Sequence, residues 1–240
     1  MRRFVATVVT LKLVLVVGFF TLFVYSQSGN QNAPVVLPTP PVFQETGNKL
    51  DRPVSDPYTG DLSIFEDSER AENLQIDRVM DILNIKDKQT VADIGAGSGW
   101  FTVRAARRTG TGPVYAVEIN QEYIDYITKR AKEENLPNIK TILGKPNDPL
   151  LPANSIDSVM LLKTYHEIAE PIALMKSVRK SLKPGGLVGI IDKNGSGDDH
   201  GLDQDKVVSE MKLAGFTLKE QYDFVKPDGM DYFLVFEISK

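Results

Sequence analysis

The chain has 240 residues, of which 42% are hydrophobic and 25% charged, and its formal net charge is −4. This composition is typical of one globular domain with room for an appendage. The acidic balance excludes the basic surface expected of a nucleic-acid-binding protein. The absence of cysteine excludes disulfides, thiolate metal sites and a cysteine nucleophile. We identify no metal site in the sequence.

The N-terminal segment, residues 1–25, begins with two arginines and continues as an apolar run from Phe4 to Tyr25, in which Lys12 is the one charged residue. Such a run is long enough to span a bilayer, which takes about 20 residues. We therefore predict one N-terminal membrane-spanning helix that anchors the chain. A signal sequence removed after export is the alternative, because Val24-Tyr25-Ser26 has the character of a cleavage site.

The anchor is followed by a change of composition. Residues 26–60 are rich in Ser, Gln, Asn and Pro and show no helical periodicity. Such a segment buries little apolar surface, and we expect an extended linker. The folded domain is then predicted to comprise residues 61–240.

The first part of that domain carries apolar residues at helical spacing from Ile64 to Leu83. The spacing predicts two helices, broken near Asp77, which would be a good N-cap. A short buried strand follows at Thr90 and ends on an acid, Asp93.

A turn with three alternate glycines, Gly95, Gly97 and Gly99, comes directly after this strand. Alternate glycines let a ligand lie against the main chain, and the N–H groups of the next helix face the same ligand. A dinucleotide-binding turn requires G-x-G-x-x-G. Here Trp100 stands where that pattern has its third glycine, which argues against NAD or FAD.

Strands and helices alternate through the rest of the chain, as a parallel sheet requires. A hairpin joined by Pro227-Asp228-Gly229 closes it. We therefore predict an α/β fold of three layers with a mostly parallel sheet and an antiparallel C-terminal hairpin. The expected helices comprise residues 100–108, 120–136, 170–182 and 203–214, and the expected strands residues 114–119, 139–143, 155–162, 187–192, 216–224 and 232–238.

The apolar strand, its acid and the G-x-G-x-G turn resemble the first motif of class I S-adenosylmethionine-dependent methyltransferases, which have a Rossmann-like fold. The turn Leu182-Lys183-Pro184-Gly185-Gly186 resembles another mark of that family. The resemblance covers about residues 61–240. It implies methyltransferase activity and S-adenosylmethionine as the cofactor.

The resemblance also implies a set of cofactor-binding residues in the first two βα units. Asp93, Gly95, Gly97 and Gly99 form the glycine turn. Glu118 lies 25 residues after Asp93 at the end of the second strand, where an acid accepts both ribose hydroxyls of an adenosine.

Other cofactor contacts are expected where the chain departs from the family pattern. Lys145 stands where the family has an acid that binds the adenine amino group, and Asp148 takes that role if the loop runs differently. Lys163 ends the fourth strand at the same edge. In related methyltransferases a segment before the first strand covers the cofactor, which would make Arg70 and Gln75 lid residues; the alternative is that both are solvated.

Tyr165 and His166 follow the fourth strand, at the edge where open α/β sheets bind ligands. We predict them as the catalytic residues on the acceptor side; the alternative is that they pack against or cap the next helix. No Asn-Pro-Pro-Tyr follows this strand, which argues against methylation of nucleic-acid bases. The expected methyl acceptor is a small or lipid-like molecule.

Two other functions remain open. A non-catalytic binding module that keeps the fold is one, because Lys145 departs from the family pattern. Aminopropyl transfer is the other, but no acidic cluster that would hold a polyamine follows the fourth strand.

The charges around the apolar segment predict its orientation. Arg2 and Arg3 precede the segment, and no Lys or Arg follows it until Lys49. The positive-inside rule then places the N-terminus in the cytoplasm and the domain on the non-cytoplasmic side. The supply of S-adenosylmethionine, which is made in the cytoplasm, argues the other way.

Overall fold

The computed structural model describes residues 52–58, 60–196 and 200–240, which belong to one compact unit. The predicted anchor, residues 1–25, and most of the predicted linker, residues 26–60, lie outside the described residues. Within the described ranges, no helix is both long and apolar enough to cross a membrane.

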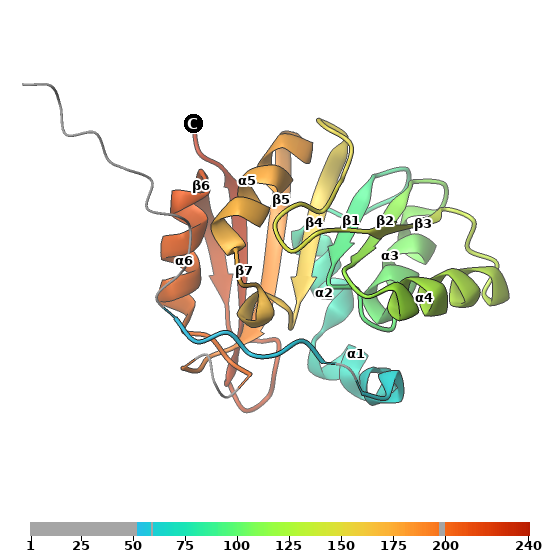
Figure 1. The fold of residues 1–240 in the computed structure, drawn as a ribbon, viewed down its shortest axis with the longest axis horizontal. Coiled ribbons are helices and arrows are strands. Elements are labelled where there is room, and N and C mark those ends of the chain that lie inside the picture. Colours follow the sequence, from blue (N-terminus) through green and yellow to red (C-terminus); the bar gives the residue numbers. More distant parts are fainter. Residues whose placement is uncertain (1–51, 59, 197–199) are drawn as a thin grey trace, which may run out of the picture. The chain divides into compact units, whose positions relative to one another are not determined.

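A seven-stranded sheet with the strand order β3-β2-β1-β4-β5-β7-β6 forms the centre of the domain (Figure 1). Neighbouring strands from β3 to β5 are parallel, and β7 is antiparallel to both β5 and β6. This arrangement confirms the predicted mostly parallel sheet with antiparallel C-terminal strands. The strands are β1 (Val91–Ile94), β2 (Val114–Glu118), β3 (Ile139–Leu143), β4 (Ile156–Leu162), β5 (Leu182–Lys193), β6 (Phe216–Tyr222) and β7 (Asp231–Ile238).

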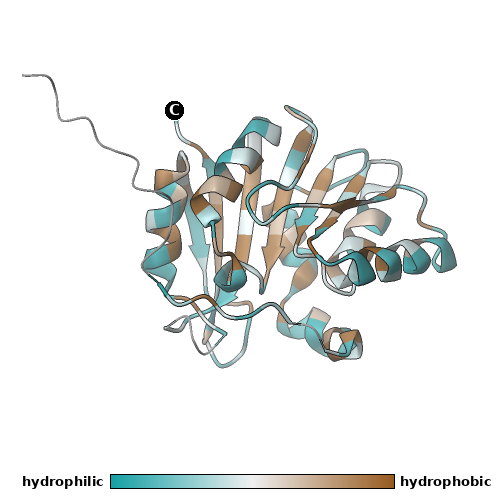
Figure 2. Cartoon of the chain, viewed as in Figure 1, coloured by the Kyte–Doolittle hydropathy of each residue, from teal (hydrophilic) through white to brown (hydrophobic). Residues whose placement is uncertain are grey.

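Helices cover both faces of the sheet, because each strand presents apolar side chains on two sides. The α-helices are α1 (Arg70–Asn73), α2 (Ile76–Ile82), α3 (Trp100–Thr109), α4 (Gln121–Glu133), α5 (Pro171–Ser181) and α6 (Gln204–Leu213), and the 3₁₀ helices are η1 (Leu62–Glu66) and η2 (Tyr165–Glu167). Figure 2 shows the central strands largely hydrophobic and the outer faces of the helices largely hydrophilic.

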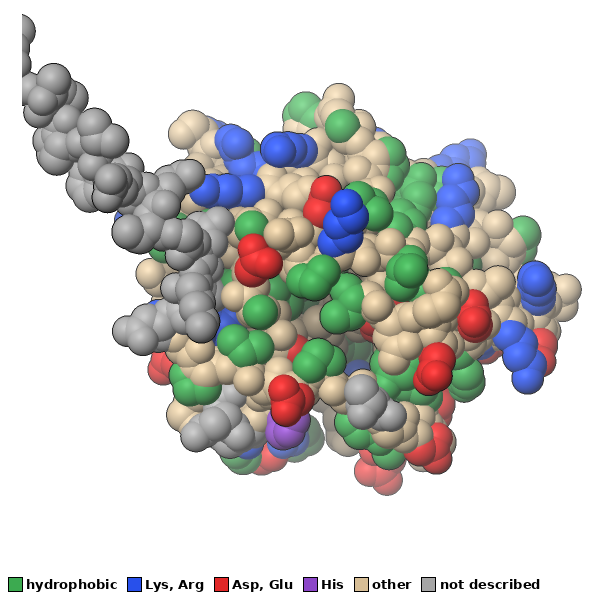
Figure 3. Space-filling model, in the orientation of Figure 1, with side chains coloured by type: hydrophobic (Ala, Val, Ile, Leu, Met, Phe, Trp, Pro, Cys, Tyr) green, Lys and Arg blue, Asp and Glu red, His purple; other side chains and the backbone are tan. Residues whose placement is uncertain are grey.

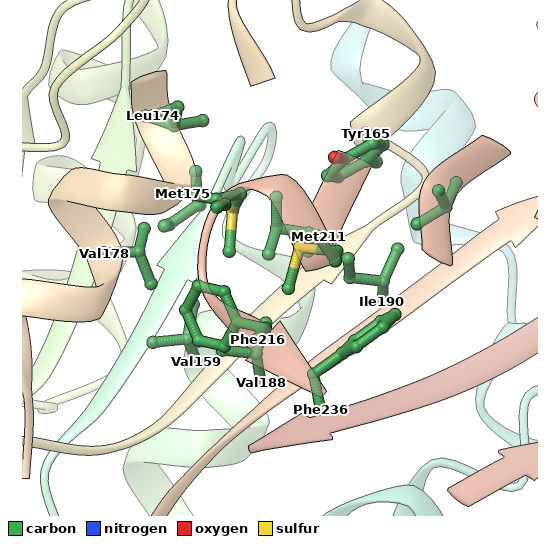
Figure 4. Close-up of a cluster of buried hydrophobic side chains, with 14 of the residues drawn as sticks. Val159, Tyr165, Leu174, Met175, Val178, Val188, Ile190, Met211, Phe216 and Phe236 are labelled. Atoms are coloured by element: carbon green, nitrogen blue, oxygen red, sulfur yellow. The ribbon is translucent and has the colours of Figure 1, made fainter. Parts of the chain in front are cut away.

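Two large clusters of buried hydrophobic side chains lie on opposite faces of the sheet. One joins the sheet to α5 and α6 and includes Met175, Met211 and Phe236 (Figure 4). The other joins it to α2 and α3. Adjacent residues of β1 divide between them: Ala92 belongs to the first cluster and Val91 to the second.

Two local predictions were wrong in detail. Helix α2 begins at Ile76, after Gln75 in a left-handed conformation with φ 46°, so Asp77 lies in the first turn and does not cap it. The predicted turn 182–186 lies within β5. This part of β5 bulges away from a regular pairing with β4. Ile156 of β4 pairs with Leu182, the next pair is Ser158 with Leu187, and the register shifts between these two pairs.

Phe236 provides a test of the first cluster, because its side chain is fully buried on β7. Phe236→Ala is expected to lower the free energy of unfolding by about 3–5 kcal/mol through lost burial and a residual cavity. Leu213→Ala, on α6 but 63% exposed, is the control and should change it by less than about 0.5 kcal/mol. Urea unfolding followed by circular dichroism measures both, and equal effects would contradict the assignment of the core.

Candidate active site

A cavity of about 1030 Å³ lies at the carboxyl ends of β1, β2 and β4. This is the edge at which open α/β sheets bind ligands. Figure 3 shows the face of the domain that is hollowed there, with hydrophobic side chains around the hollow and a histidine near its rim.

The glycine turn after β1 forms the floor of the cavity. Gly95 has φ +70°, and a Cβ atom there would come within 2.2 Å of the Thr164 side chain at the end of β4. Gly97 has φ +55°, and a Cβ atom there would meet only the Phe65 ring, at 3.7 Å. Gly95 is therefore required by the packing of β4, and the backbone at Gly97 is open to a ligand.

Gly99 differs from the other two glycines. It precedes α3 with φ +75°, and a Cβ atom there would lie 3.3 Å from Ile127 of α4. It does not line the cavity. Its geometry serves the packing of α3 against α4, so the structure does not bring the predicted cofactor residue Gly99 to the site.

Glu118, at the end of β2, is hydrogen-bonded to the turn. The Gly97 N–H donates to Glu118 Oε1 at 2.6 Å, and the Ile119 N–H donates to Oε2 at 3.1 Å. Burial raises the pKa of this carboxyl, and the backbone donors oppose the rise. The Asn120 backbone is a third donor that lowers the pKa of this carboxyl. An ionised carboxylate has about four acceptor positions, so acceptor capacity remains for a ribose hydroxyl. The residues present thus fit an adenosine cofactor.

Asp93 lies behind the turn and is almost wholly buried. Thr102 of α3 donates a hydrogen bond from Oγ1 to Asp93 Oδ2 at 2.6 Å. Desolvation, with the Glu118 charge adding to it, raises the pKa of Asp93 to about 7. Asp93 is thus a cavity-lining acid that is part protonated near neutral pH.

One of the two suggested lid residues lines the cavity. Arg70 donates from Nη1 to the Phe65 carbonyl at 2.8 Å, and its guanidinium lies 4.6 Å from the centre of the Trp100 ring. Gln75 instead donates to the Phe224 carbonyl and lies outside the lining.

The loop after β3 brings Lys145 to the cavity and leaves Asp148 outside it. The Asp148 carboxylate accepts hydrogen bonds from the Ser177 hydroxyl at 2.7 Å and from the Leu150 N–H at 3.0 Å. These bonds hold it against α5. The predicted adenine contact of Asp148 therefore has no support in this geometry.

Lys163 follows β4 and lines the cavity, as predicted for a residue at this edge. Its ammonium group is paired with the Asp231 carboxylate of β7. The pair ties the end of β4 to the antiparallel part of the sheet.

Tyr165 and His166 point in different directions from η2. Tyr165 is fully buried in the cluster with Met211 (Figure 4) and does not line the cavity, so the structure does not bring this predicted catalytic residue to the site and matches the alternative that it packs in the core. Burial, with the Glu210 carboxylate nearby, raises the pKa of Tyr165 well above its ordinary value. The tight turn of η2 sends this ring inward and the next residue towards the cavity.

His166 lines the cavity and is oriented by a buried carboxylate. Its Nδ1 lies 2.8 Å from Asp192 Oδ1, and its backbone N–H donates to Asp192 Oδ2 at 3.1 Å. Asp192 lies at the end of β5 and is completely buried. With Nδ1–H donating to the carboxylate, Nε2 is left as the basic nitrogen on the cavity side.

Two further cavity residues escaped the sequence predictions. Glu167, next to His166, has its pKa raised to about 7 by burial, and the Glu118 and Asp192 charges add to the rise. His200 also lines the cavity, from the loop before α6. The one sequence signal for Glu167 is its position directly after Tyr165 and His166 at the end of the fourth strand, and no pattern marks His200.

A strap formed by residues 54–58, which belong to the predicted linker, supplies another wall of the cavity. Arg52 anchors it: the guanidinium is ion-paired with Glu210 at 3.0 Å, and both side chains are buried. The same guanidinium donates to the carbonyls of Tyr165, His166 and Ile168. The part of the chain that packs against the domain thus begins before residue 61, the predicted start of the domain.

Residues 91–186 match the family model described as a methyltransferase domain. A protein-L-isoaspartate O-methyltransferase of Pyrococcus horikoshii is 26% identical over 108 residues, which are 45% of this chain and 46% of that protein. A demethylmenaquinone methyltransferase of Staphylococcus saprophyticus is 25% identical over 148 residues, 61% of this chain and 58% of that protein. The chain thus spans about half the length of the curated relatives that it matches.

The fold is also that of a solved protein of the same class. The crystal structure of a SAM-dependent methyltransferase from Aquifex aeolicus superposes with a TM-score of 0.67 at 22% identity, and the match covers 75% of this chain and all of that chain. Residues 91–186 thus carry a methyltransferase domain, and the described domain has the Rossmann-like fold of class I S-adenosylmethionine-dependent methyltransferases. S-adenosylmethionine is the cofactor of that family.

The raised pKa of Asp93 predicts how stability varies with pH. The folded state holds this proton more tightly than the unfolded chain, so its contribution to the free energy of unfolding falls as pH rises from about 4 to about 7. Asp93→Asn should remove this part of the fall and leave the part due to Glu118 and Glu167, and the exposed Asp125→Asn on α4 should leave the whole fall unchanged. Urea unfolding from pH 5 to pH 8 measures the difference; the same pH course in Asp93→Asn and the parent chain would refute it.

Proposed function

We propose that the chain transfers a methyl group from S-adenosylmethionine to a small or lipid-like acceptor in the described cavity. The observation that carries this proposal is the buried Glu118 carboxylate, fixed by the Gly97 N–H beside an open glycine turn. It offers an acceptor for ribose at the edge where this family binds its cofactor.

Apolar side chains around the acceptor side support a largely apolar acceptor. Leu162 lines the cavity from β4, Ile168 from the segment before α5 and Leu174 from α5 itself, and Val54 lines it from the strap. The matched Staphylococcus relative is named for demethylmenaquinone. An apolar cavity with a few polar groups is the usual form of a site for such a ligand.

The bound cofactor supplies the electrophilic methyl group, and the chain's own residues position the acceptor. Holding two reactants in line is worth up to about 7–11 kcal/mol in favourable models. When the acceptor is a hydroxyl, His166 Nε2 takes its proton, and the buried Asp192 carboxylate stabilises the resulting imidazolium. The strap and Arg70 form part of the wall around this space.

Glu118→Ala tests the proposed cofactor site. The variant loses hydrogen bonds to a charged acceptor, each typically worth about 1.5–3 kcal/mol, so binding of S-adenosylhomocysteine should weaken at least tenfold. Glu122→Ala, an exposed neighbour on α4, is the matched control and should bind as the parent chain does. Calorimetric titration measures this, and equal affinity in all three proteins would reject the site.

The second function that we consider is that of a non-catalytic binding module. Lys145, which lines the cavity where the family has an acid, favours it. A screen of metabolite and lipid extracts with radiolabelled S-adenosylmethionine separates the two: a labelled product supports transfer, and cofactor binding with no labelled product in any extract supports the module.

We also propose that residues 1–25 anchor the enzyme in a membrane with the domain on the non-cytoplasmic side. Arg2 and Arg3 before the apolar run, with no basic residue after it until Lys49, support this orientation. Export with cleavage of the segment is the alternative.

Protease digestion tests the orientation. Protease added to intact cells after permeabilisation of the outer layer should degrade the domain, because the proposed topology exposes it outside the cytoplasm. Protection until the cells are lysed would reverse the orientation. A soluble, shortened domain outside the cytoplasm would instead support cleavage.

A further inference from the structure

Three side chains with metal-binding atoms meet at the cavity rim: His166, Glu167 and His200. One ligand atom of each lies within 4.8 Å of the others. His166 Nε2 is 3.7 Å from Glu167 Oε1, and the two imidazole rings are perpendicular with their centres 5.9 Å apart. Two of the three residues are adjacent in η2, and the third comes from the loop before α6.

Asp192 supplies the supporting contact that metal-binding histidines usually have. Its carboxylate accepts from Nδ1 of His166 at 2.8 Å and is completely buried. In metal sites the non-ligating nitrogen of a histidine almost always donates to such a carboxylate or to a carbonyl. The contact fixes the tautomer that leaves Nε2 free to coordinate.

The backbone that follows His200 is packed against the end of β5, near His166. His200 has a left-handed conformation, with φ 54°. A Cβ atom on the next residue, Gly201, would lie 3.0 Å from the Lys193 carbonyl, and the Leu202 N–H donates to that carbonyl at 2.8 Å. This close packing fixes the loop to the end of β5 at Leu202, two residues after His200.

We propose that His166, Glu167 and His200 bind one divalent transition-metal ion of the Zn²⁺ type. Two imidazoles and one carboxylate form a borderline nitrogen and oxygen donor set, which suits such ions, and three protein ligands leave a coordination position open. Ligand atoms around a tetrahedral ion with bonds of about 2.0–2.1 Å lie about 3.4 Å apart, close to the separation between His166 and Glu167.

The open position of the ion lies on the cavity side, because all three ligands line the cavity. An oxygen bound there loses its proton more readily, since a divalent ion lowers the pKa of a coordinated hydroxyl or water. In the metal-bound protein His166 Nε2 is a ligand and cannot act as a base, so the acceptor's proton leaves to solvent. Only in the metal-free protein does this nitrogen take the acceptor's proton. Metal binding itself does not depend on methyl transfer.

Cobalt titration of the full chain, freed of metal and of any affinity tag, tests the site. Co²⁺ reports binding through its visible absorption, and the chain has only two histidines, so their imidazole NMR signals are resolved without ambiguity. We expect one ion per chain, paramagnetic shifts of both imidazoles, and displacement by Zn²⁺.

Variants separate this site from adventitious binding. His200→Ala and Glu167→Gln each remove a ligand and should weaken Co²⁺ binding at least hundredfold, and Asp192→Asn should weaken it about 10–100-fold by releasing the His166 ring. Glu122→Gln, on exposed α4, should bind Co²⁺ as the parent chain does.

Three outcomes would overturn the proposal: no 1:1 binding at millimolar Co²⁺, a shift of one imidazole alone, or equal affinity in the parent chain and His200→Ala. Because His200 is exposed in a loop, its variant keeps the test decisive if Glu167→Gln fails to fold. Titration without S-adenosylmethionine keeps the result separate from the proposed transfer activity.

Discussion

The hydrogen bond from the Gly97 N–H to the Glu118 carboxylate is the contact on which the site depends. It joins the turn after β1 to the end of β2, two strands whose parallel register pairs Asp93 with Ala116. The bond requires a backbone at Gly97 that side chains seldom adopt and an acid that the fold keeps largely from water. Parallel pairing brings the ends of β1, β2 and β4 to one edge, and the contact of Thr164 with Gly95 fixes the third strand against the turn.

Much of the fold and the cofactor side could be predicted because the signals are local. An apolar strand, an acid and spaced glycines occupy one short run, and Glu118 ends the next strand. The acceptor side is different: Tyr165 and His166 are neighbours in sequence, yet one is buried against Met211 and the other lines the cavity. In a 3₁₀ turn the direction of a side chain is set by what packs around it, and the sequence pattern carries no record of that packing.

Contacts between distant segments explain the remaining differences. Arg52 and Glu210 are 158 positions apart, and their buried pair holds the strap against α6, while the same guanidinium donates to backbone carbonyls of η2. Asp148 was misplaced for a similar reason, because its hydrogen bond to Ser177 of α5 decides the course of the loop. A buried ion pair is strongly unfavourable when one partner is removed, so Arg52 ties the wall of the cavity to the core of the domain.

Two buried acids of the cavity are sensitive to charge placed beside them. Burial raises the pKa of both Asp93 and Glu118, and the Arg70 guanidinium opposes the rise at Asp93. S-adenosylmethionine carries a sulfonium and an ammonium group. A cation beside these acids stabilises their ionised forms, because an opposite charge within a few ångströms lowers the pKa of a carboxyl. A cation bound beside Asp93 therefore favours loss of the Asp93 proton, so that binding of a cationic group there and proton release are coupled through this carboxyl.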